Sequence, residues 1–293
     1  MKCLGILRET QNSPGRVSDD EAILRAVLDA LRAHGVETEI IRPDAAIDEE
    51  SMGQWDLVLP MCETYPRLKR LLELSRILPA VFLNHPKAAL GCYRESLIRT
   101  LAGTPGVVVP RSEIRAVPED GALAPPDFAP KGGFWMKRGD VHNTCEHDVA
   151  YAAGARAAAA VGRDFRRREI TRVVLQEHVE GDLIKFYGVG PGQWFTWFHH
   201  DPAMARKLAF QPEDLAATAE SGARAVGLEV FGGDAIVSPG GRIFLIDLNS
   251  WPSFARVRAE AAVQISRLAL ARLRAKKTDE ELGGCDGRDE RAG

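Results

Sequence analysis

Short apolar runs and amphipathic stretches alternate along the first third of the chain. The runs that predict β-strands are residues 3–7, 38–41, 56–59 and 80–83. Between the first two, Ser18 and Glu21 have the spacing of a capping box ahead of an amphipathic helix that should stop at Gly35. Strands that alternate with helices predict a small parallel sheet. We therefore expect residues 1–84 to form an N-terminal α/β subdomain.

The middle of the chain predicts a linker followed by a second subdomain. Residues 85–106 form the linker, with a helix from about Lys87 to Leu101. Six prolines between Pro105 and Pro130 break helices and indicate loops. The second subdomain should span residues 107–181. Its predicted elements are a strand at 134–137, an Ala-rich helix at 148–161 and a strand at 172–177.

The last third of the chain contains the clearest pattern, a β-hairpin. Residues 182–275 form the predicted third subdomain, and residues 276–293 a disordered tail. The elements predicted there are a strand at 183–189, an aromatic strand at 194–200, a helix at 212–226, the hairpin strands at 227–238 and 242–248, and a helix at 255–275. The turn of the hairpin is Pro239 to Gly241. We expect the last helix to cover the sheet that contains the hairpin.

Composition and charge exclude several classes of protein. The 293 residues are 45% apolar and 27% charged, as in ordinary globular proteins. A net charge of -3 argues against nucleic-acid binding. Five cysteines without a CxxC pair predict neither a disulfide framework nor a zinc site, and are typical of reduced cytosolic thiols. The apolar stretches are too short for a signal peptide or a membrane span, so we expect a cytoplasmic protein.

Three oxygen-bearing side chains lie on the two arms of the predicted hairpin. Asp234 is on the outgoing strand, and Asp247 and Asn249 are two residues apart on the returning strand. Alternate residues of a strand share a face, so Asp247 and Asn249 point the same way. Carboxylate and amide oxygens are ligands that Mg²⁺ takes from proteins while it keeps phosphate oxygens. The hairpin therefore predicts a site for Mg²⁺, with Mn²⁺ as an alternative metal, shared with nucleotide phosphates.

This hairpin resembles the last core strands of the ATP-grasp superfamily, which end in an acid, an acid-x-Asn pair and a Pro-containing loop, here Trp251 to Ser253. The resemblance extends over residues 2–275. It implies an α/β ATP-grasp fold with an N-terminal parallel subdomain, a central lid and a C-terminal antiparallel sheet, and it implies ATP as the nucleotide. A strand-end lysine of that superfamily holds the α- and β-phosphates, and Lys137 matches it.

The resemblance also implies residues that contact the nucleoside. The hinge that meets adenine through backbone groups corresponds to Gln176, Glu177, His178 and Val179. Many relatives bind the ribose hydroxyls with a Glu where this chain has Leu183, which leaves Asp182 or Glu180 for that role. Arg94 matches the basic residue of the linker helix, with Arg99 as a rival.

Within the superfamily, the local spacing is similar to that of inositol trisphosphate kinases and of ribosomal-protein glutamate ligase-like proteins. The kinases carry histidines five and ten residues after the phosphate lysine, and His142 and His147 reproduce that spacing. Their Leu-x-Lys-x-Tyr strand is matched by residues 183–187, with Lys185 at its centre. The resemblance implies that His142 contacts the nucleotide, and that His147 and Lys185 face the phosphoryl acceptor.

The ends of the first strands argue against a highly phosphorylated acceptor. The kinases have lysines at the ends of two of these strands. In this chain, Arg8 follows the strand at 3–7 and Glu63 follows the strand at 56–59. Glu63 would repel a polyphosphate and accept an amine. Arg256, just past the metal-binding acids, has the guanidinium fork that binds a carboxylate through two hydrogen bonds.

The residues described above are compatible with three functions. We favour an Mg-ATP-dependent carboxylate–amine ligase that acts on a small-molecule substrate through an acyl phosphate, since this is the commoner chemistry of the superfamily and Glu63 disfavours polyanions. The alternative is a kinase that phosphorylates a polyol or an inositol phosphate. A nucleotide-binding regulator without turnover is the third. The sequence leaves the acceptor and the oligomeric state open.

Overall fold

The computed structural model describes residues 1–13, 15–131, 133–141 and 144–283. Contacts within the chain divide it into two compact units. The first contains Met1–Glu9, Arg16–Pro86 and the chain from Ser253 onward, and the second contains Thr10–Gly15 and Lys87–Pro252.

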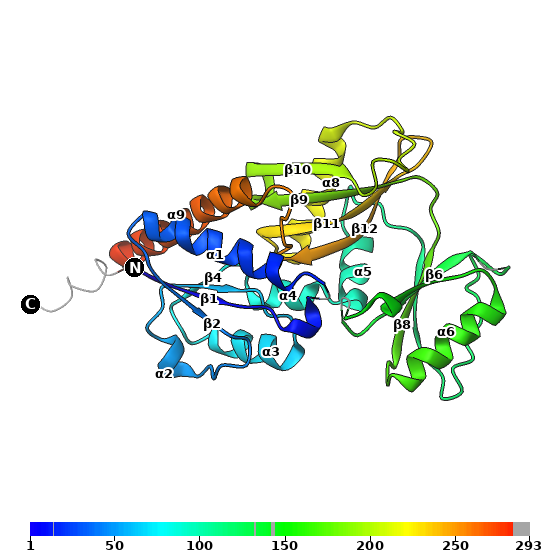
Figure 1. Ribbon diagram of the computed structural model, residues 1–293, viewed down its shortest axis with the longest axis horizontal. Helices are drawn as coiled ribbons and strands as arrows, with labels where there is room; N and C mark the ends of the chain where they lie inside the picture. Colours follow the sequence, from blue (N-terminus) through cyan, green and yellow to red (C-terminus); the bar gives the residue numbers. More distant parts are fainter. Residues whose placement is uncertain (14, 132, 142–143, 284–293) are drawn as a thin grey trace, which may run out of the picture. The chain divides into compact units, whose positions relative to one another are not determined.

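A four-stranded parallel sheet in the order β2-β1-β3-β4 forms the centre of the first unit. Its strands are β1 (Lys2–Ile6), β2 (Glu37–Ile41), β3 (Leu57–Pro60) and β4 (Val81–Phe82). The helices are α1 (Val17–Ala33), α2 (Glu49–Met52), α3 (Tyr65–Leu74) and α9 (Arg258–Gly283). Figure 1 shows α1 and α9 on one side of the sheet and α2 and α3 on the other. Helices on both faces explain why β3 is buried along its whole length. The predicted N-terminal parallel sheet is confirmed.

Two details of the first unit differ from the sequence-based predictions. Helix α1 begins at Val17 with Arg16 as its N-cap and without a side-chain cap, so Ser18 lies inside the first turn and the predicted capping box is wrong. Helix α9 belongs to the first unit, where it packs against α1 and β4, and its face of small and aliphatic residues, which includes Ala261 and Ile265, is buried. It also extends to Gly283, so residues 276–283 are helical, and 284–293 lie outside the described residues.

Two four-stranded sheets form the second unit. The lid sheet has the order β5-β8-β6-β7, and the hairpin sheet has the order β10-β9-β11-β12; every neighbouring pair is antiparallel. The lid strands are β5 (Ser112–Ala116), β6 (Phe134–Arg138), β7 (Val149–Ala152) and β8 (Arg172–Glu177). The hairpin-sheet strands are β9 (Asp182–Val189), β10 (Trp194–His199), β11 (Val230–Val237) and β12 (Ile243–Ser250). The remaining elements are α4 (Pro86–Gly91), α5 (Arg94–Ala102), α6 (Ala155–Arg167), α7 (Gly190–Gln193), α8 (Pro212–Val226), η1 (Thr10–Asn12) and η2 (Glu146–Asp148).

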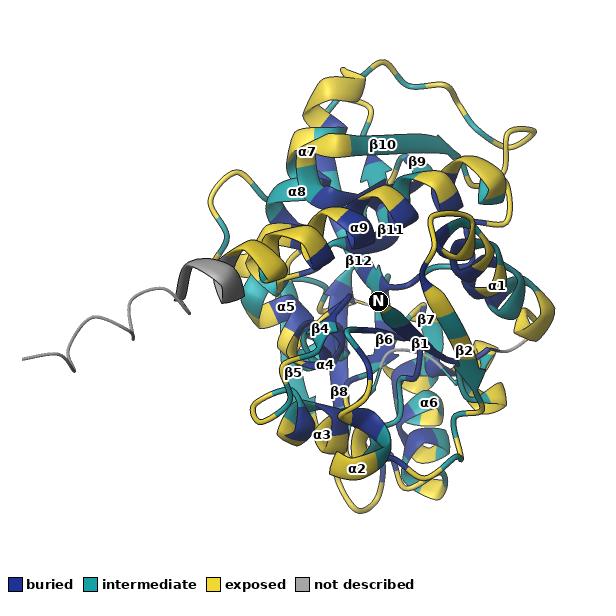
Figure 2. Ribbon diagram, turned by 90° about the vertical axis from the view of Figure 1, so that its left-hand side faces the viewer, coloured by how far each residue is buried: buried dark blue, intermediate teal, exposed yellow. Residues whose placement is uncertain are grey.

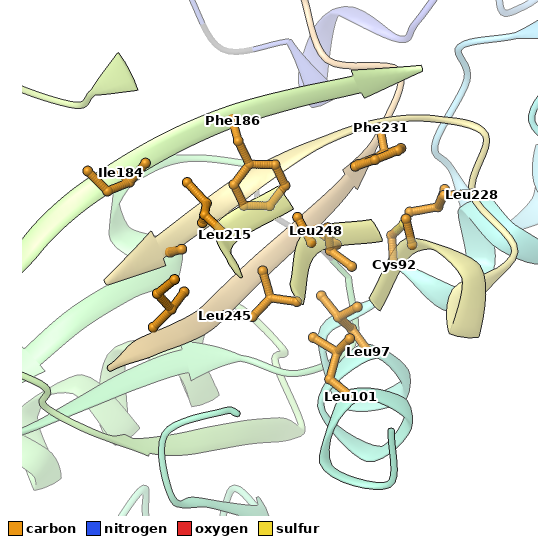
Figure 3. Close-up of a cluster of buried hydrophobic side chains, with 14 of the residues drawn as sticks. Cys92, Leu97, Leu101, Ile184, Phe186, Leu215, Leu228, Phe231, Leu245 and Leu248 are labelled. Carbon is orange, nitrogen blue, oxygen red and sulfur yellow. The ribbon is translucent and has the colours of Figure 1, made fainter. Parts of the chain in front are cut away.

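Each sheet of the second unit buries one face. The lid sheet packs its apolar face, which includes Phe134 and Met136, against Phe165 of α6. The hairpin sheet packs against α5 and α8, and Figure 3 shows Phe186, Phe231 and several leucines filling this core. Figure 2 shows burial concentrated along the strands, with the outer surfaces of the helices exposed. Because successive side chains of a strand point to opposite faces, the other face of each sheet carries the side chains that can contact a ligand.

The predicted helices of the second unit are only partly right. The Ala-rich segment predicted as one helix over 148–161 begins as strand β7, and α6 follows it. The linker helix predicted over 87–101 is broken into α4 and α5, because Tyr93 has an extended backbone and serves as the N-cap of α5. The aromatic segment at 194–199 is a strand, as predicted. In the described part of the chain, no helix combines the length and the apolar character needed to span a bilayer.

Candidate active site

Charged side chains lie in register across three neighbouring strands of the hairpin sheet. Lys185 of β9 is opposite Asp234 of β11, and Asp234 is opposite Asp247 of β12. Two residues further along, Gly232 is opposite Asn249. The side chains that alternate with these belong to the buried core. The three predicted metal ligands and Lys185 therefore share the open face of the sheet.

A β-bulge sets the phase of strand β12. Asp234 pairs with Asp247, but the neighbouring pair involves Leu245, so Ile246 is an extra residue in the strand. Leu245 and Leu248 are both fully buried although they are three positions apart. Uninterrupted alternation would turn one of them away from the core. The bulge keeps both leucines inside and turns Asp247 to the open face.

Gly232 keeps the space beside Asn249 clear of side chains. A Cβ atom at position 232 would lie 2.8 Å from Pro252 Cγ and 2.9 Å from Tyr187 Cδ1. Contacts this close are sterically forbidden, so any larger residue would displace the Tyr187 ring.

The donor set on this face fits a hard divalent cation. Lys185 Nζ donates to Asp234 Oδ1 at 2.7 Å, and both side chains are part-exposed. Asn249 Oδ1 is buried and accepts no hydrogen bond from any described residue. A buried acceptor without a donor is costly unless a ligand or cation occupies it. No group of three or more His, Cys, Asp or Glu side chains suited to a metal occurs among the described residues. Two carboxylates and one amide oxygen match Mg²⁺ that is held partly by phosphates.

Lys137 of β6 approaches these acids from the lid sheet. Its side chain is buried, with 8% of its surface exposed. Burial, and after it the charge of Arg94, lowers the pKa of Lys137 to about 8, although Asp247 and Asp234 act to raise it. The influence of both acids indicates that the Lys137 ammonium lies near Asp234 and Asp247. The structure thus brings Lys137 near the two predicted acidic metal ligands.

The break before α5 buries Arg94 in the same region. Arg94 is the first residue of α5 and is 4% exposed. Burial lowers its pKa, and the charges of Asp247 and Asp148 raise it. The next residue, Glu95, donates its backbone N–H to Gly139 O at 3.0 Å. Arg94 is therefore held beside the loop that follows Lys137, as expected for a phosphate-binding residue.

Glu95 also joins α5 to the lid strand β8. Arg172 donates two hydrogen bonds of 2.9 Å to its carboxylate. These bonds, together with one from Arg99, hold the pKa of Glu95 at about 2. Bidentate pairs of this kind fix orientation as well as distance. The start of α5 and the lid sheet are thus locked to each other near Arg94.

Asp148 organises the loop between β6 and β7. It accepts hydrogen bonds from Thr144 N at 2.6 Å and Thr144 Oγ1 at 2.9 Å, and it pairs with Arg168 and Arg138. Burial alone would raise the pKa of Asp148, but the bonds from Thr144 and Arg168 outweigh it and hold the pKa at about 2. Sequence analysis missed this residue, because it was assigned to the start of a helix.

We expect Asp148→Asn to destabilise the protein by about 2 kcal/mol at pH 7. The folded pKa of about 2 is below the unfolded value of about 4, so the ionised carboxylate stabilises the fold above about pH 4. That contribution is lost as the pH falls through the folded pKa. The measurement is urea unfolding of both proteins at pH 7 and at low pH. The exposed Glu146→Gln variant, in the same loop, is the control. Equal stability at pH 7, or a difference independent of pH, would contradict this role.

Side chains of the predicted adenine hinge contact their neighbours, and so does one backbone N–H group. Gln176 Nε2 donates to Ser112 Oγ at 3.2 Å, and Glu177 pairs with Arg111. His178 Nδ1 accepts from Trp135 Nε1 at 3.1 Å. The backbone N–H of Glu177 donates to Arg111 O. Gln176 and Glu177 end strand β8, and His178 and Val179 follow it, on the same sheet as Lys137.

The structure does not support Asp182 as the ribose ligand. Its two carboxylate oxygens accept the backbone N–H groups of Arg206 and Leu208, each at 2.7 Å, and its side chain is buried. Asp182 therefore anchors the segment before α8. Its neighbour Leu183 is on the same face as Lys185, since the two are separated by one residue on β9. Sequence alone could not show which way the carboxylate turns.

The roles of three further predicted residues stay predictions. His147 is exposed and lies 3.6 Å from the carboxylate of Glu146. His142 lies outside the described residues. Arg256 belongs to the first unit, and its carboxylate-binding role stays a prediction. The matched histidine spacing therefore carries no support from the described geometry.

Comparison with known proteins supports the fold. No family model matches the chain, and no curated protein matches its sequence. Solved structures do match: a RimK domain protein ATP-grasp from Sphaerobacter thermophilus is 18% identical, with a TM-score of 0.67 over 92% of this chain and 99% of that chain. D-cycloserine synthetase DcsG is 17% identical over the same shares, also with a TM-score of 0.67. The D-alanine–D-alanine ligase from Bacillus anthracis in complex with ATP is 13% identical, with a TM-score of 0.69 over 95% and 99%. With its parallel N-terminal sheet, lid sheet and hairpin sheet, the chain has the ATP-grasp fold.

Proposed function

We propose that this protein is a Mg-ATP-dependent carboxylate–amine ligase. The observation that supports the proposal most is that Asp234 and Asp247 are cross-strand neighbours and that both of their charges act on the buried Lys137 ammonium. A buried cation opposite two acids and an orphaned amide oxygen suits a triphosphate with a divalent metal. Two of the structural neighbours named above are a D-alanine–D-alanine ligase and a D-cycloserine synthetase, and they favour ligase chemistry by analogy of fold.

The proposed reaction has two steps. A substrate carboxylate oxygen attacks the γ-phosphorus of ATP, the bond to the β-phosphate oxygen breaks, and ADP leaves. The neutral amine of the second substrate then attacks the acyl carbon, inorganic phosphate leaves, and the amine loses a proton. Asp234, Asp247 and Asn249 would hold Mg²⁺, which neutralises phosphate charge when bound.

Residues of the chain itself bind and orient the nucleotide. Lys137 and Arg94 place two positive charges in a buried region, where they act on phosphate oxygens with little screening by water. Lys185 is held at Asp234 by its 2.7 Å bond, and we propose that it orients the transferred phosphoryl group from there.

The kinase alternative retains one supporting observation, the position of Lys185 beside the metal-binding acids. The described part of the first unit argues against a polyphosphate acceptor. Arg8 lies 3.1 Å from both Asp20 and Glu63, so its charge is already balanced. Polyanions need a surplus of positive charge that this pair of acids removes.

Assays with pools of amino acids and pools of polyols as candidate substrates distinguish the ligase from the kinase. We expect phosphate release from ATP to depend on a carboxylate together with an amine, and radiolabel from γ-labelled ATP to appear in inorganic phosphate. Stable label on a hydroxyl compound would contradict the ligase and establish the kinase. ATP binding without turnover in either pool would indicate a regulator.

A further inference from the structure

Two buried cations of the second unit lie near each other although their charges repel. Arg94 and Lys137 are 4% and 8% exposed, and the charge of Arg94 lowers the pKa of Lys137. Like charges in a region of low dielectric repel more strongly than they do in water. Other contacts of the unit must therefore hold together the chain segments that carry these two side chains.

Three short segments meet beside the two cations and form a closed ring of hydrogen bonds. The N–H of Glu95, the residue after Arg94, donates to Gly139 O at 3.0 Å. The N–H of Gly139, two residues after Lys137, donates to Arg172 O at 2.8 Å. Arg172 closes the ring with its two bonds of 2.9 Å to the Glu95 carboxylate. The ring therefore links the start of α5, the end of β6 and the start of β8.

The ring is tightly packed, and its carboxylate has no evident electrostatic purpose for phosphate binding. A Cβ atom at position 139 would lie 3.2 Å from both the carbonyl carbon and the Cβ of Arg172, so the two segments approach each other closely. A carboxylate beside cations that attract phosphate works against that attraction. The geometry of the Glu95–Arg172 pair, which fixes orientation as well as distance, is what remains to explain its presence there.

We infer that Glu95 and Arg172 are positioning residues for the nucleotide, and that their ion pair holds Arg94 and Lys137 at the separation that receives the phosphates. Groups that are already ordered bind more tightly, because the cost of ordering them is not incurred on binding. This inference rests on the proposed role of the two cations as phosphate-binding residues. It is independent of whether the phosphoryl acceptor is a carboxylate or a hydroxyl.

Nucleotide affinity tests the inference, with Glu95→Gln as the decisive variant. If the carboxylate acted only through its charge, its removal would tighten the binding of ADP and of a non-hydrolysable ATP analogue. Loss of positioning has the opposite sign. We expect both nucleotides to bind about 10-fold more weakly in the presence of Mg²⁺, while adenosine, which carries no phosphate, binds as it does to the wild type. The measurement is calorimetry at a temperature where circular dichroism shows each variant to be folded.

A double-mutant cycle shows whether the two residues act through one pair. Arg172→Gln alone should weaken the binding of ADP by at least as much as Glu95→Gln does. The double variant should bind ADP no more weakly than Arg172→Gln, because the second substitution has no pair left to break. Arg99→Gln is the matched control: Arg99 donates to the same carboxylate at 2.9 Å, but from the next turn of α5. It should keep the wild-type affinities within about 2-fold.

Unchanged or tighter binding of ADP to Glu95→Gln, additive losses in the double variant, or an equal loss of affinity for adenosine would overturn the inference. Failure of the proposed function gives a different result. The expected binding effects without ligase turnover would leave the positioning role standing while the ligase proposal fails. A wild-type protein that binds no nucleotide would overturn both.

Discussion

Asp247→Asn is expected to lower turnover of magnesium nucleotide by about 10²- to 10³-fold while the protein stays folded. The substitution preserves shape and removes one negative charge from the open face of β12, opposite Asp234. An amide oxygen remains, but it binds a divalent cation more weakly than a carboxylate does. Steady-state phosphate release over a range of Mg²⁺ concentrations is the measurement, and excess Mg²⁺ should restore part of the lost rate.

Asp214→Asn is the matched control for this change. Asp214 is an exposed residue in the first turn of α8, in the same unit, so the chemical change is identical and the location is remote from the open face of β12. It should turn over at the wild-type rate. If Asp247→Asn also retained full turnover at limiting Mg²⁺, these side chains would not be metal ligands, and the proposed function would lose its main support.

Lys137→Met is expected to lower kcat/KM for ATP by about 10²-fold, since it removes the buried cation that we propose binds the phosphates. The wild-type profile should also fall as the pH rises through about 8, because the charged form of Lys137 is lost there. Lys137→Arg keeps its charge at these pH values and should remove that fall, whatever its absolute rate.

Initial rates at saturating Mg²⁺ between pH 6 and pH 10 are the readout for these variants. Lys207→Met, at an exposed lysine of the same unit, is the control and should keep the wild-type profile. A decline above pH 8 that persisted in Lys137→Arg would assign the titration to another group.

The sequence was sufficient for the parts of this site that depend on strand periodicity. Asp247 and Asn249 share a face because they are two residues apart on a strand. Asp234 and Asp247 stand out in the sequence because their strand neighbours are apolar. In the structure, both acids lie near enough to Lys137 for their charges to raise its pKa. The family resemblance predicted the N-terminal parallel sheet and the C-terminal antiparallel sheet that the structure contains.

Features that depend on tertiary contacts were not visible in the sequence. Nothing in the Ala-rich segment distinguishes strand β7 from the start of a helix, because pairing with β6 overrides helix propensity. The direction of the Asp182 carboxylate is set by backbone N–H groups more than twenty residues away. The histidine spacing matched a family pattern, but His147 is exposed beside Glu146.

The extra residue Ile246 makes the direction of the functional side chains depend on the bulge that absorbs it. Deleting Ile246 would restore plain alternation and keep Leu245 and Leu248 on one face with Asp247 on the other, whereas a further inserted residue without a second bulge would turn either Leu245 or the pair Asp247 and Leu248 to the wrong face. The four-residue turn at 238–241 sits at the end of the same hairpin and is under no such constraint. Insertions should therefore be tolerated at the tip of this hairpin and be selected against in its returning arm.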